Sequence, residues 1–503
     1  MHTNSSKLKL NLAIFACVIA AMLFCANSSP FINIITTDSS AFRVMGRAMA
    51  AGKVMYKDIF DHKGLYLYVI NALGVLISSK SFFGLFVIEC VFMFLCARIA
   101  YSILSNYADS KTSFIGTQIF MALSLMRNVF GNGNLSEGYG LLFQVLAVYM
   151  LIKDGGKFSC LHMFFQGICA GTVIFFRPNI AMMWGGIALV AGYEMLRQKR
   201  FARLAGNIAA WISGVIVAAA PAVIYAVMTD SVSDMIFGMF GYNMMYLSSG
   251  EMGKFSPFTL IWRILALVNP PGSILSLLEL NFFLAVLIFS CALMLKKYRN
   301  FPFIKYYFAM MIITLVSVAL SGRSYGHYYE MLSPFCLPFA YWAASKVKPE
   351  KYKSAAILLT IITVMMGTII PNSIREYFGK QNITVDEFVK CNEPYYSENE
   401  RVLVTVHGAM FYEAFGVIPQ EKYFYTPSNE YSAFPEAVDS HVASILSGVN
   451  DVIIVITLGG EKGIYPETGK STEIQEFLDS YYDLLHYEED GKRSAAMYGK
   501  KRK

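Results

Sequence analysis

The sequence predicts a polytopic α-helical membrane protein with about 11 transmembrane helices and a small C-terminal extracytoplasmic α/β domain. Of its 503 residues, 55% are hydrophobic and only 15% are charged. A soluble chain of this composition would lack the polar residues needed to cover its surface. Long apolar runs recur through residues 1–371, whereas residues 372–503 mix charge, Pro and Tyr. We therefore predict a transmembrane domain at 1–371 and a separate domain at 372–503.

Apolar runs define the expected spans, because a membrane-crossing helix needs roughly 20 apolar residues. The first run, residues 10–26, follows two lysines like the core of a signal peptide, but the many later runs favour a retained anchor. A shorter run at residues 258–268 is interpreted as an interfacial helix on the outer face. The predicted spans are residues 10–27, 81–104, 112–130, 138–153, 160–176, 179–196, 205–228, 274–295, 303–320, 328–346 and 354–371.

Basic residues set the predicted orientation, since cytoplasmic loops carry the excess of Lys and Arg. With the N-terminus cytoplasmic, the basic loops near residues 111, 153–157, 197–203, 296–299 and 346–353 all fall on the cytoplasmic side. The loops rich in other polar residues then fall on the outer face. An odd number of spans places the C-terminal domain on the outer face as well.

The C-terminal domain has two apolar β-type runs, at residues 401–406 and 451–457. Runs of this kind, separated by a helical segment such as 432–448, predict buried parallel strands in an α/β fold. Gly459-Gly460 lacks the residues of a phosphate-binding loop and is interpreted as a plain turn. The basic end, residues 492–503, is expected to be frayed.

Several function classes are disfavoured by the sequence. The net charge of +7 is spread in short clusters between apolar runs, as membrane topology requires, so we expect the lipid bilayer and not nucleic acid as a partner. Eight of the nine cysteines fall in or beside apolar runs, and none forms a zinc-type pattern with histidine. The motifs of serine hydrolases, zinc peptidases and nucleotide-binding loops do not occur in a fitting context.

Ionisable residues gather directly behind the first apolar run, where they are costly unless they bind something. Asp58, Asp61, His62 and Lys63 lie in one turn-rich segment. Interfacial anchoring by Lys and Tyr is one interpretation. The other is a substrate site in which Lys63 binds a lipid phosphate, since Lys is a compact charge for phosphate oxygens.

Asp38 lies at the outer end of the first run and precedes a helical pattern that ends at Gly52. An N-cap aspartate explains this position, at about 1 kcal/mol of helix stability. The same position also favours the carboxylate form, because the helix dipole is positive at the N-terminus. A general base needs that form at neutral pH, so Asp38 is the candidate catalytic residue.

Other candidates lie in later outer loops. Arg177 and Arg323 are interpreted as further phosphate contacts, although an arginine at a membrane interface also occurs without a ligand. Tyr325, His327 and Tyr328 could bind a sugar, or belong to an aromatic interfacial belt. Glu137 has a second carboxylate, which is interpreted either as a substrate contact or as a residue that only supports its own loop. The pattern leaves a metal site unknown: no cofactor is certain, and a divalent cation stays open.

The order of these motifs resembles the bacterial GT-C glycosyltransferases of the mannosyltransferase and aminoarabinose-transferase type. The resemblance is carried by Asp38, by GRAMAAGKVMYKDIFDHKG, NGNLSEGYGLLF and FFRPN, and by GRSYGHYYEMLSPF. It implies a GT-C fold and sugar transfer from a polyprenyl-phosphate carrier outside the cytoplasm. By position, Asp38 resembles the family's catalytic aspartate, and Lys63 and Arg177 resemble its phosphate contacts. Ser39 and Gly64 depart from the commonest pattern, in which Glu follows the Asp and Pro follows the Lys.

Together, the residues and the resemblance predict a multi-pass enzyme of the bacterial plasma membrane. We expect an inverting transfer in which Asp38 takes the proton of the acceptor hydroxyl while cations stabilise the departing lipid phosphate. The acceptor could be an envelope glycan, a lipid or a protein. Two alternatives stay open: a transporter or flippase of lipid-linked glycans, and a non-catalytic partner in envelope glycan assembly.

Overall fold

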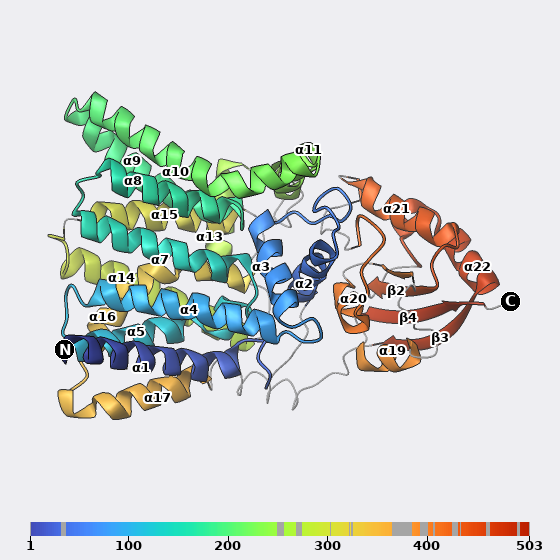
Figure 1. Ribbon diagram of the computed structural model, residues 1–503, viewed down its shortest axis with the longest axis horizontal. Helices are drawn as coiled ribbons and strands as arrows, with labels where there is room; N and C mark the ends of the chain where they lie inside the picture. Colours follow the sequence, from blue (N-terminus) through green and yellow to red (C-terminus); the bar gives the residue numbers. More distant parts are fainter. Residues whose placement is uncertain are drawn as a thin grey trace.

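The computed structural model divides the chain into a helical bundle and a smaller sheet-containing part (Figure 1). The described residues are 2–31, 37–248, 256–267, 274–301, 303–320, 322, 325–364, 385–392, 401–405, 408–424, 431–432, 434–458, 463–489 and 493–501. Gly459-Gly460 and Arg323, both named above, lie outside these ranges.

The bundle helices run side by side, with the N-terminus at the end farthest from the sheet (Figure 1). Of the described helices, four are long and apolar enough to cross a membrane: Lys7–Cys25, Phe83–Leu104, Phe201–Met228 and Ser276–Lys296. The chain is an integral membrane protein. The bundle comprises α1 (His2–Cys25), α4 (Phe83–Leu104), α5 (Ser110–Ser124), α7 (Ser136–Asp154), α8 (Cys160–Ile174), α9 (Met183–Arg197), α10 (Phe201–Met228), α14 (Ile274–Lys296), α15 (Ile304–Leu320), α16 (Leu337–Ala344) and α17 (Tyr352–Val364).

Each expected span overlaps a described helix, and three of the spans are irregular. Residues 365–371 of the last expected span lie outside the described ranges. Residues 112–130 form α5 and the short α6 (Arg127–Phe130), and residues 328–346 begin in the 3-10 helix η3 (Gly326–Cys336) before α16. The segment 179–196 begins as the 3-10 helix η1 (Pro178–Met182). The count of eleven spans stays a prediction.

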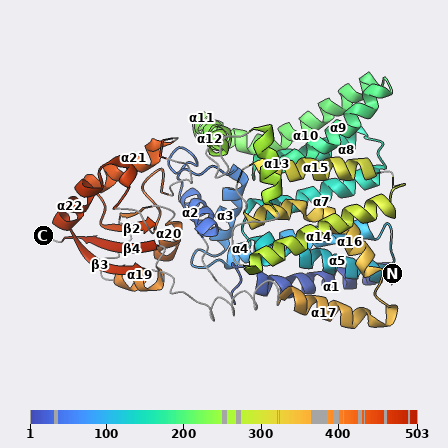
Figure 2. The same ribbon diagram turned by 180° about the vertical axis from the view of Figure 1, so that it is seen from behind.

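Smaller elements follow α10 in the chain. They are α11 (Val232–Ile236), the π-helix η2 (Phe237–Gly241), α12 (Tyr242–Ser248) and α13 (Pro257–Ala266), with η4 (Pro349–Lys351) later, before α17. Seen from behind, α13 lies across the end of the bundle near the sheet (Figure 2). Its bounds match the interfacial helix predicted at residues 258–268.

Two helices from the first polar segment lie between the bundle and the sheet (Figure 1). They are α2 (Thr37–Ala50) and α3 (Leu65–Ile77), and they pack against each other through a shared core that includes Met45 and Leu67. Close packing is possible at Gly46, where a Cβ would lie 2.5 Å from the backbone of Asn71. The predicted site segment is thus held between the two parts of the molecule.

The sheet has four strands in the order β1-β2-β4-β3. The two predicted runs form β1 (Val402–Val404) and β2 (Val452–Leu458) and pair in parallel. Antiparallel pairing adds β3 (Tyr482–Glu489) and β4 (Arg493–Lys500). The helices of this part are α19 (Val385–Asn392), α20 (Ala409–Phe415), α21 (Pro435–Leu446) and α22 (Ser471–Tyr481), with the 3-10 helix η6 (Pro466–Thr468).

The prediction of a frayed basic end was wrong for residues 493–500. They form β4, which lies between β2 and β3 in the sheet. The alternation in Ser494-Ala-Ala-Met-Tyr498 places Ala495 and Met497 in the core, and the lysines that suggested fraying come at the strand's end. Burial of these apolar residues against the neighbouring strands stabilises β4 despite the nearby charged residues.

The sheet part contacts the first polar segment directly. Phe60 packs in an aromatic cluster with Tyr423 and Phe434, at ring-centroid distances of 5.3 and 6.2 Å. The backbone N–H of Phe60 donates to the carbonyl of Lys422 at 2.8 Å. Glu413 of α20 forms ion pairs with Arg43 and Arg47 of α2. The C-terminal part therefore covers the segment in which the site is predicted.

Candidate functional site

The site is built where the loop before α3 meets the end of α8. The N–H of Gly64 donates to the carbonyl of Phe176 at 3.0 Å, and the N–H of Tyr66 donates to that of Phe175 at 2.9 Å. A Cβ on Gly64 would lie 2.1 Å from the carbonyl oxygen of Phe175. Glycine is therefore required for this approach, and a proline at position 64 would lose the first bond. The contact brings Lys63 toward Arg177, 114 residues later in the chain.

Asp61, His62 and Lys63 form a connected polar cluster. The Lys63 Nζ donates to Nε2 of His62 at 2.7 Å, and Nδ1 of His62 lies 3.1 Å from Oδ1 of Asp61. Because an ammonium only donates, His62 must carry its proton on Nδ1, facing the carboxylate. Tyr68 donates to the other oxygen of Asp61 at 2.9 Å. The cluster thus fixes the direction of the Lys63 side chain.

The charges in this cluster follow from burial and from one another. Burial, the largest influence, and the adjacent Lys63 ammonium lower the pKa of His62 to about 4, and Asp61 opposes the change. Burial alone would raise the pKa of Asp61, but Lys63 and His62 outweigh it and the pKa is lowered. At neutral pH the cluster therefore holds an anionic Asp61 and a neutral His62.

A second cluster is centred on Arg177, the residue that precedes η1. Its Nη1 forms an ion pair with Glu137, in the first turn of α7, and its Nη2 donates to the hydroxyl of Tyr328 at 2.7 Å. The guanidinium also lies 4.4 Å from the Tyr328 ring centroid. The Glu137 carboxylate accepts a further bond from Ser136 at 2.8 Å. Arg177 is held in one orientation from two sides.

The aromatic side chains of η3 border this second cluster. The His327 ring stacks on Tyr325, with centroids 5.7 Å apart and planes at 10°, and meets the Tyr328 ring edge-on at 4.7 Å. Burial lowers the pKa of His327, and the carboxylates of Glu137 and Asp38 oppose that change. Of the three rings, Tyr325 is exposed, whereas Tyr328 is buried against the Arg177 guanidinium.

Asp38 lies in the first turn of α2 and its side chain is exposed. Residues 32–36, directly before α2, lie outside the described ranges, so the N-cap position of Asp38 stays a prediction. The neighbouring Ser39 is buried, and its hydroxyl accepts from Asn134 at 3.0 Å. That amide is also bonded to Asn71 at 2.9 Å, so α2, α3 and the loop before α7 are joined beside Asp38.

The two clusters and Asp38 act on one another electrostatically. Burial lowers the pKa of Lys63, and Asp61 opposes this; the charges of Arg177, Asp38 and Glu137 also reach the Lys63 ammonium. Lys63 and these four acidic or basic side chains, from the segment 38–63, from the start of α7 and from the residue before η1, thus share one region. The arrangement places two cations near one exposed carboxylate, which suits an anionic ligand whose reaction needs a base.

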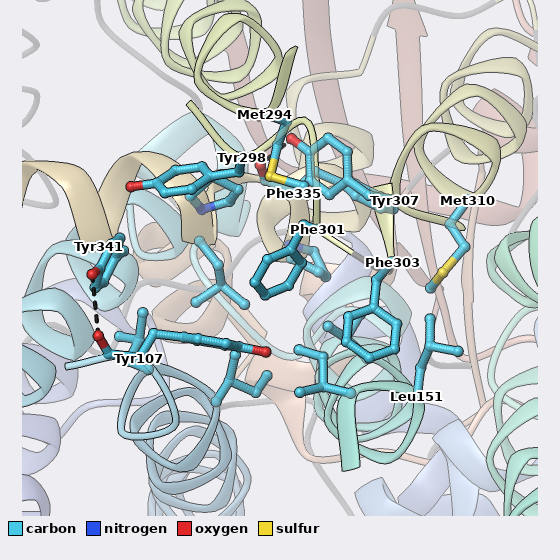
Figure 3. A pocket seen from close by; sticks show the side chains of 17 residues that line it. Tyr107, Leu151, Met294, Tyr298, Phe301, Phe303, Tyr307, Met310, Phe335 and Tyr341 are labelled. Carbon is cyan, nitrogen blue, oxygen red and sulfur yellow. Dashed lines mark hydrogen bonds between the residues drawn. The ribbon is translucent and has the colours of Figure 1, made fainter. Parts of the chain in front are cut away.

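Some predicted residues lie elsewhere. Asp58 is exposed, and its carboxylate accepts from the backbone N–H of Val54 at 2.8 Å within its own turn. Within the described ranges, no group of three or more His, Cys, Asp or Glu side chains could hold a metal ion. A cavity of about 260 Å³ lies near the other end of the bundle, lined by residues such as Tyr107, Tyr298 and Phe335 (Figure 3). It contains none of the predicted site residues.

Sequence reasoning missed several residues that support the site. Tyr56 donates to the carbonyl of Lys63 at 2.8 Å, and Asn243 donates to that of His62 at 2.9 Å. Glu330 is fully buried, and its carboxylate would lie 3.5 Å from a Cβ on Gly138. The sequence could have indicated Tyr56 and Tyr68, since they lie within or beside the same charged segment. No sequence pattern indicated Asn243, because its partner His62 lies 181 residues away.

Comparison with solved structures gives a match over nearly the whole chain. The crystal structure of ArnT from Cupriavidus metallidurans bound to undecaprenyl phosphate superposes with a TM-score of 0.64, covering 98% of each chain at 11% identity. The chain has the ArnT fold. ArnT in the apo state matches with a TM-score of 0.50 at 10% identity, again over 98% of each chain. No protein-family profile matches the sequence. No curated protein matches it either.

ArnT is an aminoarabinose transferase with the GT-C fold, so the fold implied by the resemblance is confirmed. At 11% identity the likeness concerns the fold.

Proposed function

We propose that this protein transfers a sugar from a polyprenyl-phosphate donor to an acceptor of the cell envelope, on the outer face of the bacterial plasma membrane. The observation that carries the proposal is the convergence of Lys63 and Arg177 beside Asp38, imposed by the contact of Gly64 with Phe176. The fold supports the same conclusion, because ArnT with this fold was crystallised with undecaprenyl phosphate. An envelope glycan, a lipid or a protein would supply the attacking hydroxyl.

In the proposed reaction, the donor phosphate lies against Lys63 and Arg177. The acceptor oxygen attacks the anomeric carbon, its proton passes to Asp38, and the bond from that carbon to the lipid phosphate breaks. The electron pair of that bond goes to the phosphate oxygen, whose negative charge the two cations stabilise. Direct displacement inverts the anomeric configuration. Arg323, outside the described residues, is proposed as a third phosphate contact.

The first test is replacement of Asp38 by Asn. The amide keeps the size of the side chain but cannot take a proton, so turnover should fall by roughly 100-fold or more. The assay follows transfer of a radiolabelled sugar from a polyprenyl-phosphate donor by the purified protein. Size-exclusion elution and thermal unfolding should match the wild type. Near-normal transfer by Asp38→Asn would rule out its role as a base.

The same assay separates the alternative functions. A flippase moves the lipid-linked sugar between leaflets of a vesicle without breaking its bond to phosphate, and an assembly partner does neither. Release of free polyprenyl phosphate in step with labelled product supports transfer. If no free polyprenyl phosphate is released and the intact donor crosses the vesicle membrane, the protein is a transporter and the proposed transfer is wrong.

A further inference from the structure

The polar cluster around Lys63 closes into a ring through Tyr68, which lies near the start of α3. The Tyr68 hydroxyl accepts from the backbone N–H of Lys63 at 3.0 Å and donates to Oδ2 of Asp61 at 2.9 Å. Oδ1 of the same carboxylate lies 3.1 Å from Nδ1 of His62. The other ring nitrogen, Nε2, accepts from the Lys63 ammonium at 2.7 Å. The backbone and the side chain of Lys63 are therefore both joined to one carboxylate.

Each contact in this ring has a fixed donor and a fixed acceptor. A backbone N–H and an ammonium only donate, and an ionised carboxylate only accepts. The Tyr68 hydroxyl has a single proton, so a hydroxyl that accepts from Lys63 is left to donate to Asp61. His62 is neutral at neutral pH, and its one ring proton faces the carboxylate from Nδ1. Asp61 thus determines which nitrogen of His62 accepts from Lys63.

The ring is shielded from water, which makes its polarity important. Asp61, His62 and Tyr68 are 3%, 8% and 0% exposed. When two donors face each other in a buried site, water does not replace the lost hydrogen bond, so the wrong ring tautomer is costly. The ammonium would then turn away from the imidazole, and a ligand would have to order the lysine as it binds.

We propose that Asp61 and Tyr68 are positioning residues, which set the hydrogen-bond polarity of His62 and thereby hold Lys63 ready for an anionic head group. The inference rests on the proposed function for the identity of that ligand, a polyprenyl phosphate. It gives Asp61 and His62 an indirect role, through Lys63, in place of a direct contact with substrate.

The substitution Asp61→Asn should reverse the polarity of the ring. The new amide oxygen must face Tyr68, whose hydroxyl proton needs an acceptor, and the amide NH2 then faces Nδ1 of His62. The ring proton consequently moves to Nε2, where it opposes the Lys63 ammonium. Affinity for undecaprenyl phosphate should fall about tenfold, the effect of losing one hydrogen bond to a charged group.

Two measurements on the purified protein test this without requiring sugar transfer. ¹⁵N NMR of histidine-labelled protein distinguishes protonated from unprotonated ring nitrogens, and the His62 signals are identified among the seven histidines by their loss in His62→Gln. Titration with undecaprenyl phosphate, followed by native mass spectrometry, gives the affinity. In Asp61→Asn the proton should move from Nδ1 to Nε2 as the affinity falls.

A pair of substitutions at His62 tests the same idea with the Asp61 charge intact. His62→Gln should keep the wild-type affinity, because a glutamine amide offers NH2 to Asp61 and an oxygen to Lys63. His62→Leu removes that acceptor and should lower the affinity about tenfold. Equal affinities in these two variants would overturn the inference, whether or not Asp61→Asn folds.

Tyr68→Phe separates hydrogen-bond polarity from the loss of a charge. Without the hydroxyl, the amide introduced by Asp61→Asn is free to turn its oxygen toward His62. In the Tyr68→Phe background, Asp61→Asn should therefore lower the affinity by only about twofold or less, a departure from additivity. The control is Asp230→Asn, whose exposed carboxylate pairs with Lys57 at 3.2 Å and which should change neither measurement.

Three results would contradict the positioning role. One is an unchanged His62 tautomer in Asp61→Asn, and another is an equal loss of affinity from Asp61→Asn with and without Tyr68, which would assign the effect to charge alone. The third is a wild type that binds no undecaprenyl phosphate, which would also remove the proposed function. If the wild type binds this lipid but transfers no sugar, and the variants behave as expected, the positioning role stands and the proposed function fails.

Discussion

At the scale of single residues, Lys63 illustrates how a buried cation is kept in place for a ligand. Its ammonium donates to neutral His62, which in turn faces the Asp61 carboxylate. The Asp61 carboxylate, which stabilises the Lys63 charge, thus lies on the other side of the His62 ring. The direct hydrogen-bond partner of the ammonium is the neutral imidazole. An arriving phosphate would meet a lysine that is already oriented, which lowers the entropy cost of binding.

Acidification should destabilise the protein through His62. The side chain titrates near 6.5 when unfolded, whereas burial and then Lys63 hold its pKa at about 4 in the folded protein. Between these values only the unfolded chain binds the proton, so the free energy of unfolding falls as pH drops from 6.5 to 4. The contribution is on the order of 3 kcal/mol. Thermal unfolding in detergent at pH 7, 5 and 4 measures it.

The variant His62→Gln identifies the source of this effect, because glutamine cannot titrate. Its unfolding midpoint should decline less between pH 7 and 4 than that of the wild type. Part of the decline should persist, since burial also lowers the pKa of His441 to about 4. A variant that declines as steeply as the wild type would exclude His62 as the group responsible.

Gly64 is the residue at which a single added carbon should separate the two clusters. In Gly64→Ala, the Cβ would meet the carbonyl oxygen of Phe175 at 2.1 Å, and backbone cannot yield as a side chain can. We expect a loss of about 1–3 kcal/mol in stability and a raised KM for the donor. Thermal unfolding and transfer kinetics measure the two effects. The control Gly192→Ala adds its Cβ to open space and should leave stability unchanged or slightly higher.

At the scale of elements, other parts of the chain hold α2 near its start and in its middle. Near its start, Ser39 is bonded through Asn134 to Asn71. In its middle, Arg43 donates to the carbonyls of Ser78, Ser79 and Ser81, at 2.9 to 3.1 Å, and pairs with Glu413. The position of Asp38 therefore depends on the C-terminal part as well as on the bundle.

Glu413→Gln should loosen this attachment. Arg43 is 1% exposed and Glu413 is 7% exposed, so removing the negative charge leaves a buried guanidinium uncompensated. Breaking such a pair costs about 3 kcal/mol or more. We expect a lower unfolding midpoint, faster proteolysis of the C-terminal part and reduced turnover. The control is Glu476→Gln on the exposed face of α22, which should change none of these.

A double substitution distinguishes positioning from general destabilisation. Replacing Arg43 and Glu413 by similar-sized apolar residues removes both charges and should recover stability. If turnover stays low in that variant, the ion pair positions α2. Full recovery of turnover would show that stability alone was affected.

At the scale of the whole molecule, the candidate site lies at the end of the bundle that the sheet part covers, and the basic loops lie at the other end (Figure 1). This separation fits the positive-inside rule and underlies the proposed outer location of the site.

Cysteine labelling tests the proposed orientation. In a variant without its nine native cysteines, a single cysteine at Glu476 in the sheet part should react with a membrane-impermeant maleimide in intact cells. A single cysteine at Lys199, between α9 and α10, should react only after the cells are opened. The reverse pattern would place Asp38 and Lys63 on the cytoplasmic side and contradict the proposed function.

Local pattern was sufficient for much of the fold. Apolar runs located the bundle helices, and two β-type runs located β1 and β2, because hydrophobic periodicity reflects burial directly. The same local signals failed at β4, where the burial of Ala495 and Met497 depends on neighbouring strands. They also could not show that Asp58 turns outward while Asp61, three residues later, is buried.

By itself, the sequence determined that the chain is a membrane protein, and it predicted which side chains of the polar segments are candidates for the chemistry. The identity and local grouping of Asp38, Asp61, His62 and Lys63 are properties of adjacent residues. Only the tertiary structure decided that Arg177 acts electrostatically on Lys63 and that Glu413 forms an ion pair with α2. Those relations join residues far apart in the chain, and they arise from backbone packing at Gly64 and between helices, which no local pattern encodes.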